Sequence, residues 1–265
     1  MSSRSAKPAR ILIVDDSHTM RDMLKAVLTS DGIDVIGQLS SGKLLLQSIA
    51  KMSPDIVCLD YNLPDSNGID LLKSIVSEYP HVAVVIITGE TNPNLQNAAA
   101  ESGAAGFIHK PFSQDRIIKE FRQIIQTQRL LADMNKPSEP PKFAITSTAI
   151  VVDDSKTIRA LLIAILTNDG IQVVGEATNG LQAVEMVTQL QPDIVCLDVV
   201  MPVMGGMEAL KQIRNMNPAT KIVMITANSS RDLVVEALKE GAAGFIVKPL
   251  VAEKVSAAIA RILRT

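Results

Sequence analysis

The sequence is poor in the residues that bind nucleic acid. It has no tryptophan, five phenylalanines and two tyrosines. With so few aromatic side chains the core must be aliphatic, and a stacking surface for single-stranded nucleic acid is not expected. Twenty-six basic and 28 acidic residues give a net charge of −2, so the whole chain attracts no polyanion. We therefore expect no nucleic-acid partner.

The sequence also shows no signal for disulfides or for membrane segments. The two cysteines, Cys58 and Cys196, both lie inside apolar runs, which is typical of buried thiols in a reducing compartment. The apolar run at 11–14 is too short for the core of a signal peptide. No apolar run approaches the length of about 18 residues that a transmembrane helix needs. The sequence predicts a cytoplasmic protein without a membrane partner.

The chain contains one long internal repeat, since residues 11–127 align with residues 149–265 without a gap. The identical blocks include VDDS, PDIVCLD and GAAGFI. A unit this long, present twice, indicates duplication of a whole domain and excludes a solenoid. The proline-rich stretch at 136–142 is typical of a linker. The predicted organisation is a first domain at 8–132, a linker at 133–146 and a second domain at 147–265.

Each copy alternates short β-branched runs with segments of helical period. In the first copy the predicted strands are 11–14, 35–39, 55–59, 83–87 and 106–109. The predicted helices are about 17–29, 42–51, 66–77, 92–101 and 113–132. Continuously apolar strands indicate a sheet that helices cover on both faces. The fold class is therefore α/β, with one doubly wound parallel sheet of five βα units per copy.

Polar residues stand where the predicted strands end, and the functional site of such a sheet lies at that edge. In the first copy they are Asp15, Asp16, Asp60, Thr88 and Lys110. In the second copy they are Asp153, Asp154, Asp198, Thr226 and Lys248, at the same spacings. The recurrence of the whole set, and not any one member, points to a shared chemistry.

These residue types together suit a phosphoryl group. Three converging carboxylates repel one another, and a hard dication such as Mg²⁺, which takes oxygen ligands, relieves that repulsion. The lysine adds a fixed positive charge and the threonine a hydroxyl. The central carboxylate, Asp60 or Asp198, is then placed to act as the nucleophile that forms an aspartyl-phosphate.

Both copies resemble the receiver domain of bacterial two-component response regulators, of the single-domain chemotaxis type. The motifs that carry the resemblance are the acid pair, the central Asp, the Thr and the Lys-Pro, each at a strand end and each occurring twice. The resemblance implies a flavodoxin-like (βα)5 fold with the parallel strand order 2-1-3-4-5. It also implies one Mg²⁺ per domain and a cis Lys-Pro bond that aims the lysine inward.

The resemblance further implies a role for each residue of the motifs. In the first copy the metal residues would be Asp16, Asp60 and the backbone carbonyl of Asn62, with Asp15 acting through water. In the second copy they would be Asp154, Asp198 and the carbonyl of Val200, with Asp153 acting through water. The residues that contact the phosphoryl oxygens would be Thr88 and Lys110, or Thr226 and Lys248. The switch aromatics would be Phe107 and Phe245.

Two other families of α/β proteins fit these residues poorly. A dinucleotide-binding domain needs G-x-G-x-x-G after the first strand, where this chain has Asp-Asp-Ser. A haloacid-dehalogenase-type phosphatase carries a second Asp two residues after its nucleophile, where this chain has Asn62 or Val200. The expected function is therefore a response regulator without an output domain and without enzymatic turnover beyond its own phosphorylation and dephosphorylation.

The expected partners are proteins. A sensor histidine kinase or a histidine phosphotransfer protein would phosphorylate Asp60 and Asp198, and an unknown output protein would receive the signal, with chemotaxis or motility as the favoured pathway. The alternative is a phosphorelay intermediate or a phosphate sink. The apolar positions Ile117, Phe121, Ile124 and Leu131 could pair with another copy to form a homodimer or with the second domain, or could simply pack on their own sheet.

Two positions predict that the second domain holds its phosphoryl group longer than the first. In receivers, the residues two after the nucleophile and two after the Thr flank the attacking water. They are Asn62 and Glu90 in the first copy and Val200 and Asn228 in the second. Asn and Glu hydrogen-bond a water and hold it in line, whereas Val offers no hydrogen bond.

Overall fold

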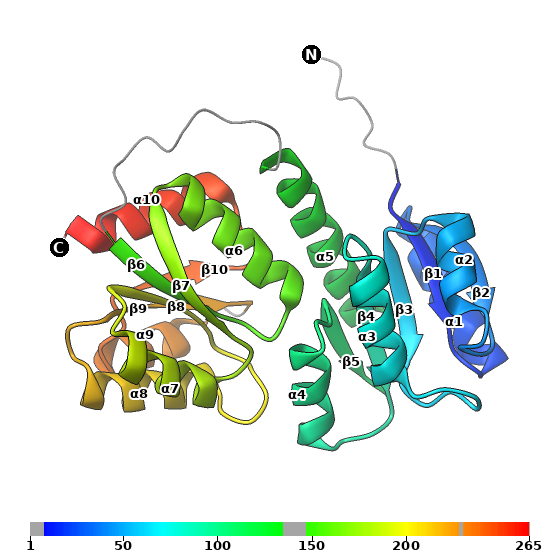
Figure 1. Ribbon diagram of the computed structural model, residues 1–265, viewed down its shortest axis with the longest axis horizontal. Helices are drawn as coiled ribbons and strands as arrows, with labels where there is room; N and C mark the ends of the chain where they lie inside the picture. Colours follow the sequence, from blue (N-terminus) through cyan, green and yellow to red (C-terminus); the bar gives the residue numbers. More distant parts are fainter. Residues whose placement is uncertain (1–7, 135–146, 228–229, 265) are drawn as a thin grey trace, which may run out of the picture. The chain divides into compact units, whose positions relative to one another are not determined.

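The computed structural model describes residues 8–134, 147–227 and 230–264 (Figure 1). The chain divides into two compact units, Met1–Ile125 and Gln126–Thr265. The predicted linker at 133–146 lies outside the described residues from residue 135 onward.

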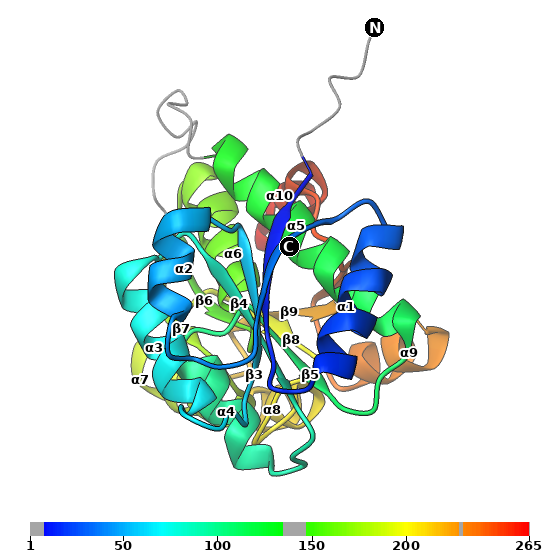
Figure 2. The same cartoon turned by 90° about the vertical axis from the view of Figure 1, so that its right-hand side faces the viewer.

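The first unit is a five-stranded parallel sheet in the order β2-β1-β3-β4-β5. Its strands are β1 (Arg10–Val14), β2 (Asp34–Leu39), β3 (Ile56–Asp60), β4 (Ala83–Thr88) and β5 (Gly106–His109). Its helices are α1 (His18–Ser30), α2 (Leu45–Met52), α3 (Gly68–Glu78), α4 (Pro93–Glu101) and α5 (Gln114–Met134), the last of which continues past Ile125. In Figure 2, α1 and α5 lie on one face of this sheet, and α2, α3 and α4 lie on the other.

The second unit repeats this topology, with the sheet order β10-β9-β8-β6-β7. Its strands are β6 (Ser147–Val152), β7 (Ile171–Ala177), β8 (Ile194–Asp198), β9 (Lys221–Thr226) and β10 (Gly244–Val247). Its helices are α6 (Lys156–Asn168), α7 (Gly180–Leu190), α8 (Gly206–Met216), α9 (Arg231–Lys239) and α10 (Ala252–Arg264). The predicted fold class and strand order are confirmed in both units.

Each sheet separates two layers of aliphatic core. Along β1, Ile11 and Ile13 enter the layer under α1 and α5, while Leu12 and Val14 enter the layer under α2 and α3. This alternation follows from the period of two along a strand, and it requires apolar residues at every position when both faces are covered. Cys58 and Cys196 are buried in these layers as predicted, and burial raises the pKa of the Cys196 thiol to about 12.

Two predicted helix starts are wrong by a few residues. The helix expected from residue 42 begins at Leu45, because the backbone N–H groups of Gly42 and Lys43 donate to the carboxylate of Asp65, each at 3.0 Å. The helix expected from residue 66 begins at Gly68, because the Asn67 side chain accepts from the Ile69 N–H at 2.8 Å and caps the helix. Both starts depend on side chains that satisfy backbone donors.

Three of the four apolar positions predicted on α5 are used inside the first unit. Ile117, Phe121 and Ile124 are buried in the core layer that also contains Ile11 and Ile13. Of the arrangements that the sequence left open, packing on their own sheet is therefore the one these three side chains adopt. The fourth position, Leu131, falls in the second unit and packs against the core layer of that unit, as the alternative of pairing with the second domain predicted. No helix among the described residues is long and apolar enough to cross a membrane.

Candidate functional site

The first site lies at the carboxyl edge of the β2-β1-β3-β4-β5 sheet, where the predicted residues meet. Asp15 and Asp16 follow β1 and Asp60 ends β3, and carboxylate oxygens of all three lie within 4.8 Å of one another. Asp15 and Asp60 are buried, whereas Asp16 is exposed. The buried pair is therefore fixed by the fold, and the third carboxylate faces solvent.

Lys110 joins the two buried acids. Its Nζ lies 2.6 Å from Asp60 Oδ1 and 2.9 Å from Asp15 Oδ2. Burial alone would lower the pKa of Lys110, but the hydrogen bonds and charges of Asp60 and Asp15 raise it, so the ammonium stays charged. Burial raises the pKa of Asp60, against the opposing effect of Lys110. The Lys110-Pro111 bond is cis, as the resemblance implied.

The rim of the first site is polar and hydrogen-bonded. The buried Thr88 hydroxyl oxygen accepts from the backbone N–H of Glu90 at 3.0 Å. The side-chain amide of Asn62 donates to the Glu90 carboxylate at 3.2 Å, and the Asn62 backbone N–H donates to Asp60 Oδ2 at 3.2 Å. The two positions predicted to flank the attacking water therefore contact each other.

The second site has the same arrangement at the edge of the second sheet. Carboxylate oxygens of Asp153, Asp154 and Asp198 lie within 4.8 Å of one another. Lys248 Nζ lies 2.7 Å from Asp153 Oδ2 and 2.9 Å from Asp198 Oδ1, and the Lys248-Pro249 bond is cis. Thr226 is buried at the end of β9.

The second site is more deeply buried than the first. The Lys248 side chain is 8% exposed, against 23% for Lys110. Burial, together with the neighbouring charge of Asp153, raises the pKa of Asp198 to about 8, even though Lys248 opposes that shift. The two copies of the motif therefore place the same charged residues in environments that differ in burial.

The rims of the two sites also differ. Val200, which corresponds to Asn62, is 73% exposed and offers no polar side chain. Val203 beside it has a positive φ of 65°, which is unusual for a β-branched residue. Asn228, the second residue of the predicted pair, lies outside the described residues.

An arginine that the sequence analysis missed holds the acid-pair loop in each unit. The Arg21 guanidinium donates to the backbone carbonyls of Asp15 at 2.7 Å and Asp16 at 3.0 Å. In the second unit the buried Arg159 donates to the carbonyls of Asp153 at 2.8 Å and Asp154 at 3.3 Å. The signal in the sequence was an Arg at the same offset from VDDS in both copies.

The predicted switch aromatics lie on the last strand of each sheet. Phe107 on β5 is half-buried, and its ring meets that of His109 edge-on with 4.9 Å between the centroids. Phe245 on β10 is half-buried against the core layer under α7 and α8. Their role as switches stays a prediction.

The donor set of each site fits a hard dication. Three carboxylates and one ammonium leave two formal negative charges, which a divalent cation balances. Asp153 Oδ2 has no hydrogen-bond partner in the part of the chain that the structure describes, apart from its ion pair with Lys248. Carboxylate oxygens around a partly open position are typical of Mg²⁺ sites.

Comparison with known proteins agrees with this geometry. The family model of the response regulator receiver domain matches residues 11–122 and 149–260. This chain belongs to that family. The receiver fold and the tandem organisation predicted from the sequence are therefore confirmed.

Several relatives cover one or both receiver domains. Chemotaxis protein CheY of Thermotoga maritima is 42% identical over 113 residues, which are 43% of this chain and 94% of that protein. Protein-glutamate methylesterase/protein-glutamine glutaminase 5 of Anaeromyxobacter dehalogenans is 31% identical over 203 residues, 74% of this chain and 56% of that protein. A solved CheX-CheY complex with BeF3 and Mg from Borrelia burgdorferi matches at 33% identity over 44% of this chain and 90% of that chain, with a TM-score of 0.44.

Proposed function

We propose that both receivers are phosphoacceptors, with Asp60 and Asp198 as the nucleophiles, and that the donor is the phosphohistidine of a kinase or phosphotransfer protein. The observation that carries the proposal is the central carboxylate held by a lysine, at 2.6 Å in the first site and 2.9 Å in the second, beside two further acids. Neither receiver lacks any member of the set.

In the proposed reaction, a carboxylate oxygen of Asp60 or Asp198 attacks phosphorus. A P–O bond forms, the P–N bond to the donor imidazole breaks, and the leaving imidazole takes up a proton. Mg²⁺, held by the three acids, would neutralise charge on the transferring phosphoryl oxygens. Lys110 or Lys248 is placed to pair with a phosphoryl oxygen once the carboxylate has been phosphorylated to the acyl phosphate, and Thr88 or Thr226 supplies a hydroxyl at the neighbouring strand end. Hydrolysis by water returns the carboxylate and releases inorganic phosphate.

We further propose that the chain signals through protein contacts and turns over no external substrate. The names of its relatives favour chemotaxis as the pathway. A phosphate sink is the second candidate, and one contact favours it: the Asn62–Glu90 hydrogen bond places two water-binding side chains at the rim of the first site, where the second site has Val200 in place of Asn62. In that scheme the first receiver discards phosphate and the second retains it.

The test is labelling of the full chain with radioactive acetyl phosphate, with Mg²⁺ or with EDTA. The expected result is label on both receivers with Mg²⁺ and none with EDTA. Asp60→Asn should leave label only at Asp198, and Asp198→Asn only at Asp60. A double variant that still takes up base-labile label would show that the nucleophiles are assigned incorrectly.

A further inference from the structure

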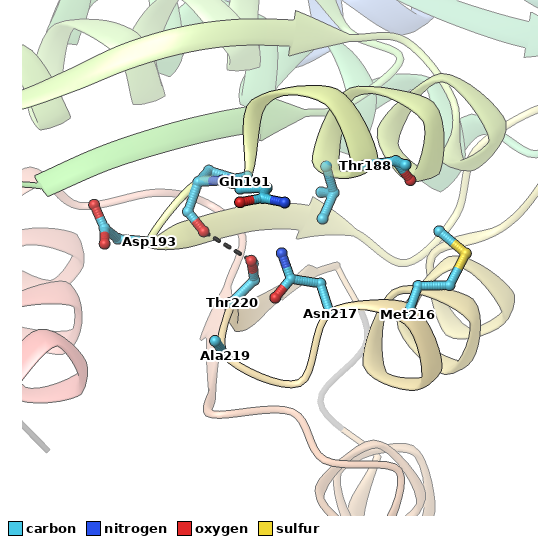
Figure 3. A pocket seen from close by; sticks show the side chains of 9 residues that line it. Thr188, Gln191, Asp193, Met216, Asn217, Ala219 and Thr220 are labelled. Carbon is cyan, nitrogen blue, oxygen red and sulfur yellow. Dashed lines mark hydrogen bonds between the residues drawn. The ribbon is translucent and has the colours of Figure 1, made fainter.

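A cleft of about 350 Å³ opens in the second unit, at the edge of the sheet opposite the phosphorylation site (Figure 3). It lies where β8 begins, whereas Asp198 is the last residue of that strand. Residues from the ends of α7 and α8 form most of its wall: Val187, Thr188, Gln191, Pro192, Met216 and Asn217. The cleft is therefore separate from the site described above.

In the first unit a tyrosine, Tyr79, stands at the position of Asn217. Tyr79 and Asn217 occupy the same backbone position, just after α3 and α8, with φ and ψ of −131° and 64° against −135° and 83°. Each donates its N–H to a carbonyl at 2.7 Å. Tyr79 packs on the core layer under α2 and α3, and its hydroxyl lies 3.5 Å from the Leu46 carbonyl oxygen. Because the backbone is the same, the short Asn217 side chain is what leaves the space open.

The other residues that differ between the two units around this space do not fill it. Thr188 and Gln191 are larger than their counterparts Ala50 and Ser53. The Thr188 hydroxyl donates to the Val184 carbonyl at 2.9 Å, which holds this side chain against its own helix; that carbonyl is the counterpart of the Leu46 carbonyl near the Tyr79 hydroxyl, so in the second unit this acceptor is already used. The remaining volume is at the lower end of the range for small-molecule pockets, roughly 300–1,000 Å³, and it is more than enough for one ring, since a cavity of about 150 Å³ binds benzene.

The lining combines apolar walls with two available amides. Val187 and Pro192 are buried, and Met216 is 53% exposed, with a thioether that makes favourable contacts to aromatic rings. Figure 3 shows the side-chain amides of Gln191 and Asn217 turned toward each other. Neither forms a side-chain hydrogen bond with any other residue that the structure describes. The Thr220 hydroxyl is already used, since it donates to the Pro192 carbonyl at 2.7 Å.

We propose that this cleft binds one phenol ring, in place of the tyrosine that the first unit supplies from its own chain. The ring would lie against the exposed Met216 and above the fully buried Val187, and its hydroxyl would hydrogen-bond the amides of Gln191 and Asn217. The phenol belongs either to a free small molecule or to a tyrosine of a partner polypeptide, and the two sources present the same chemistry to the cleft.

In the first experiment the full chain is labelled at its Met and Val methyl groups and titrated with p-cresol, which is the isolated side chain of tyrosine. The methyl NMR signals are followed during the titration. The Met216 and Val187 signals should shift saturably, with a Kd on the order of 1 mM because the ligand is so small. Asn217→Tyr should abolish these shifts and raise the unfolding temperature of the second unit, since its ring fills the cleft.

A mirror variant gives the matched control. Tyr79→Asn should open the equivalent cleft in the first unit, so that the Ile49 methyl signal, in a sample labelled at isoleucine, responds to p-cresol there as well. Tyr79→Phe should not open it, because the ring remains. These two variants keep the proposal testable even if Asn217→Tyr fails to fold.

A second ligand distinguishes the sources. If acetyl-Ala-Tyr-Ala-amide shifts the Met216 signal as p-cresol does, the cleft accepts a tyrosine of a polypeptide. If p-cresol alone does so, the ligand is a free phenol. The proposal is overturned if p-cresol produces no saturable shift at Met216, or if a folded Asn217→Tyr protein shows the same shift as the wild type.

Discussion

At the scale of single residues, the rims of the two sites should set the lifetime of each phosphoryl group. Asn62 and Glu90, which the resemblance to receivers places beside the attacking water, are joined by a hydrogen bond, whereas Val200 has only methyl groups at the position that corresponds to Asn62. A positioned water lowers the barrier to in-line attack, so its loss slows hydrolysis. The difference expected from one such contact is about tenfold, or about 1.4 kcal/mol of barrier.

The first prediction follows from that contrast. Asn62→Val should slow release of phosphate from Asp60 by about tenfold, and Val200→Asn combined with Asn228→Glu should speed release from Asp198. The measurement is the decay of label after Mg²⁺-dependent phosphorylation, with the other receiver blocked by Asp198→Asn or Asp60→Asn. Equal lifetimes in the two receivers, or variants without effect, would refute the role of these positions.

The second prediction concerns the charge on Asp198. Burial and the charge of Asp153 raise its pKa from 3.8, the value in the unfolded chain, to about 8 in the folded protein. Folding therefore favours the protonated form of this carboxyl group. Stability is then highest below that unfolded value and is lost as the pH rises toward the folded value, through a window of roughly pH 4 to 8. Removing the charge should therefore stabilise the second unit at pH 7.5 in the absence of metal.

Thermal unfolding in EDTA should accordingly show Asp198→Asn melting several degrees above the wild type at pH 7.5, with a smaller difference at pH 5. Mg²⁺ should raise the unfolding temperature of the wild type more than that of the variant, since binding to the folded state stabilises it. A variant that melts lower than the wild type at pH 7.5 would show that the ion pair with Lys248 outweighs the repulsion among the acids.

At the scale of elements, the close approach of α8 to β8 fixes the nucleophile. A Cβ atom on Gly206 would lie 2.0 Å from the backbone oxygen of Asp198, a distance that no side chain tolerates. A Cβ on the neighbouring Gly205 would meet its nearest atom, the Val199 oxygen, at 3.4 Å, an ordinary contact. The loop between β8 and α8 therefore has room only for glycine at position 206, whereas position 205 has room for a Cβ atom.

The third prediction uses these two glycines as a matched pair. Gly206→Ala should destabilise the second unit by about 1–3 kcal/mol, the usual cost of overpacking, and should lower the rate of Asp198 phosphorylation because the strand end is displaced. Gly205→Ala should leave both nearly unchanged. Urea unfolding and acetyl phosphate labelling measure the two effects, and equal behaviour of the variants would contradict the close approach.

At the scale of the whole molecule, each unit has its own sheet, its own two core layers and its own complete site. A domain with a separate core unfolds as its own cooperative unit. The consequences of a substitution in one sheet should therefore stay within that unit.

The fourth prediction tests this independence. In the Gly206→Ala protein, amide hydrogen exchange should accelerate in β6 and β8 and stay unchanged in β1 and β3. Label at Asp60 should also stay unchanged, which serves as the internal control for donor and metal. Faster exchange in β1 would show that the two units share stability.

The sequence by itself determined the tandem organisation, the strands and the composition of both sites. The strands were predictable because a run such as Ile11–Val14, apolar at every position, can only be buried on both faces of a sheet. The acids, Thr88 and Lys110 were predictable as a group because parallel strands bring their carboxyl ends to one edge. Both predictions depend on the spacing of apolar residues along the chain and on the order of the strands, and one sequence is enough to read them.

Only the tertiary structure decided which side chains complete those elements. The start of α2 depends on Asp65 from another loop, and the acid-pair carbonyls depend on Arg21, which no strand-end rule selects. The greater burial of Lys248 and the cleft beside Asn217 are likewise visible only in the folded chain. Such contacts join residues that are distant in sequence, and their geometry depends on the volumes of all the neighbours at once, which the pattern of a single segment does not contain.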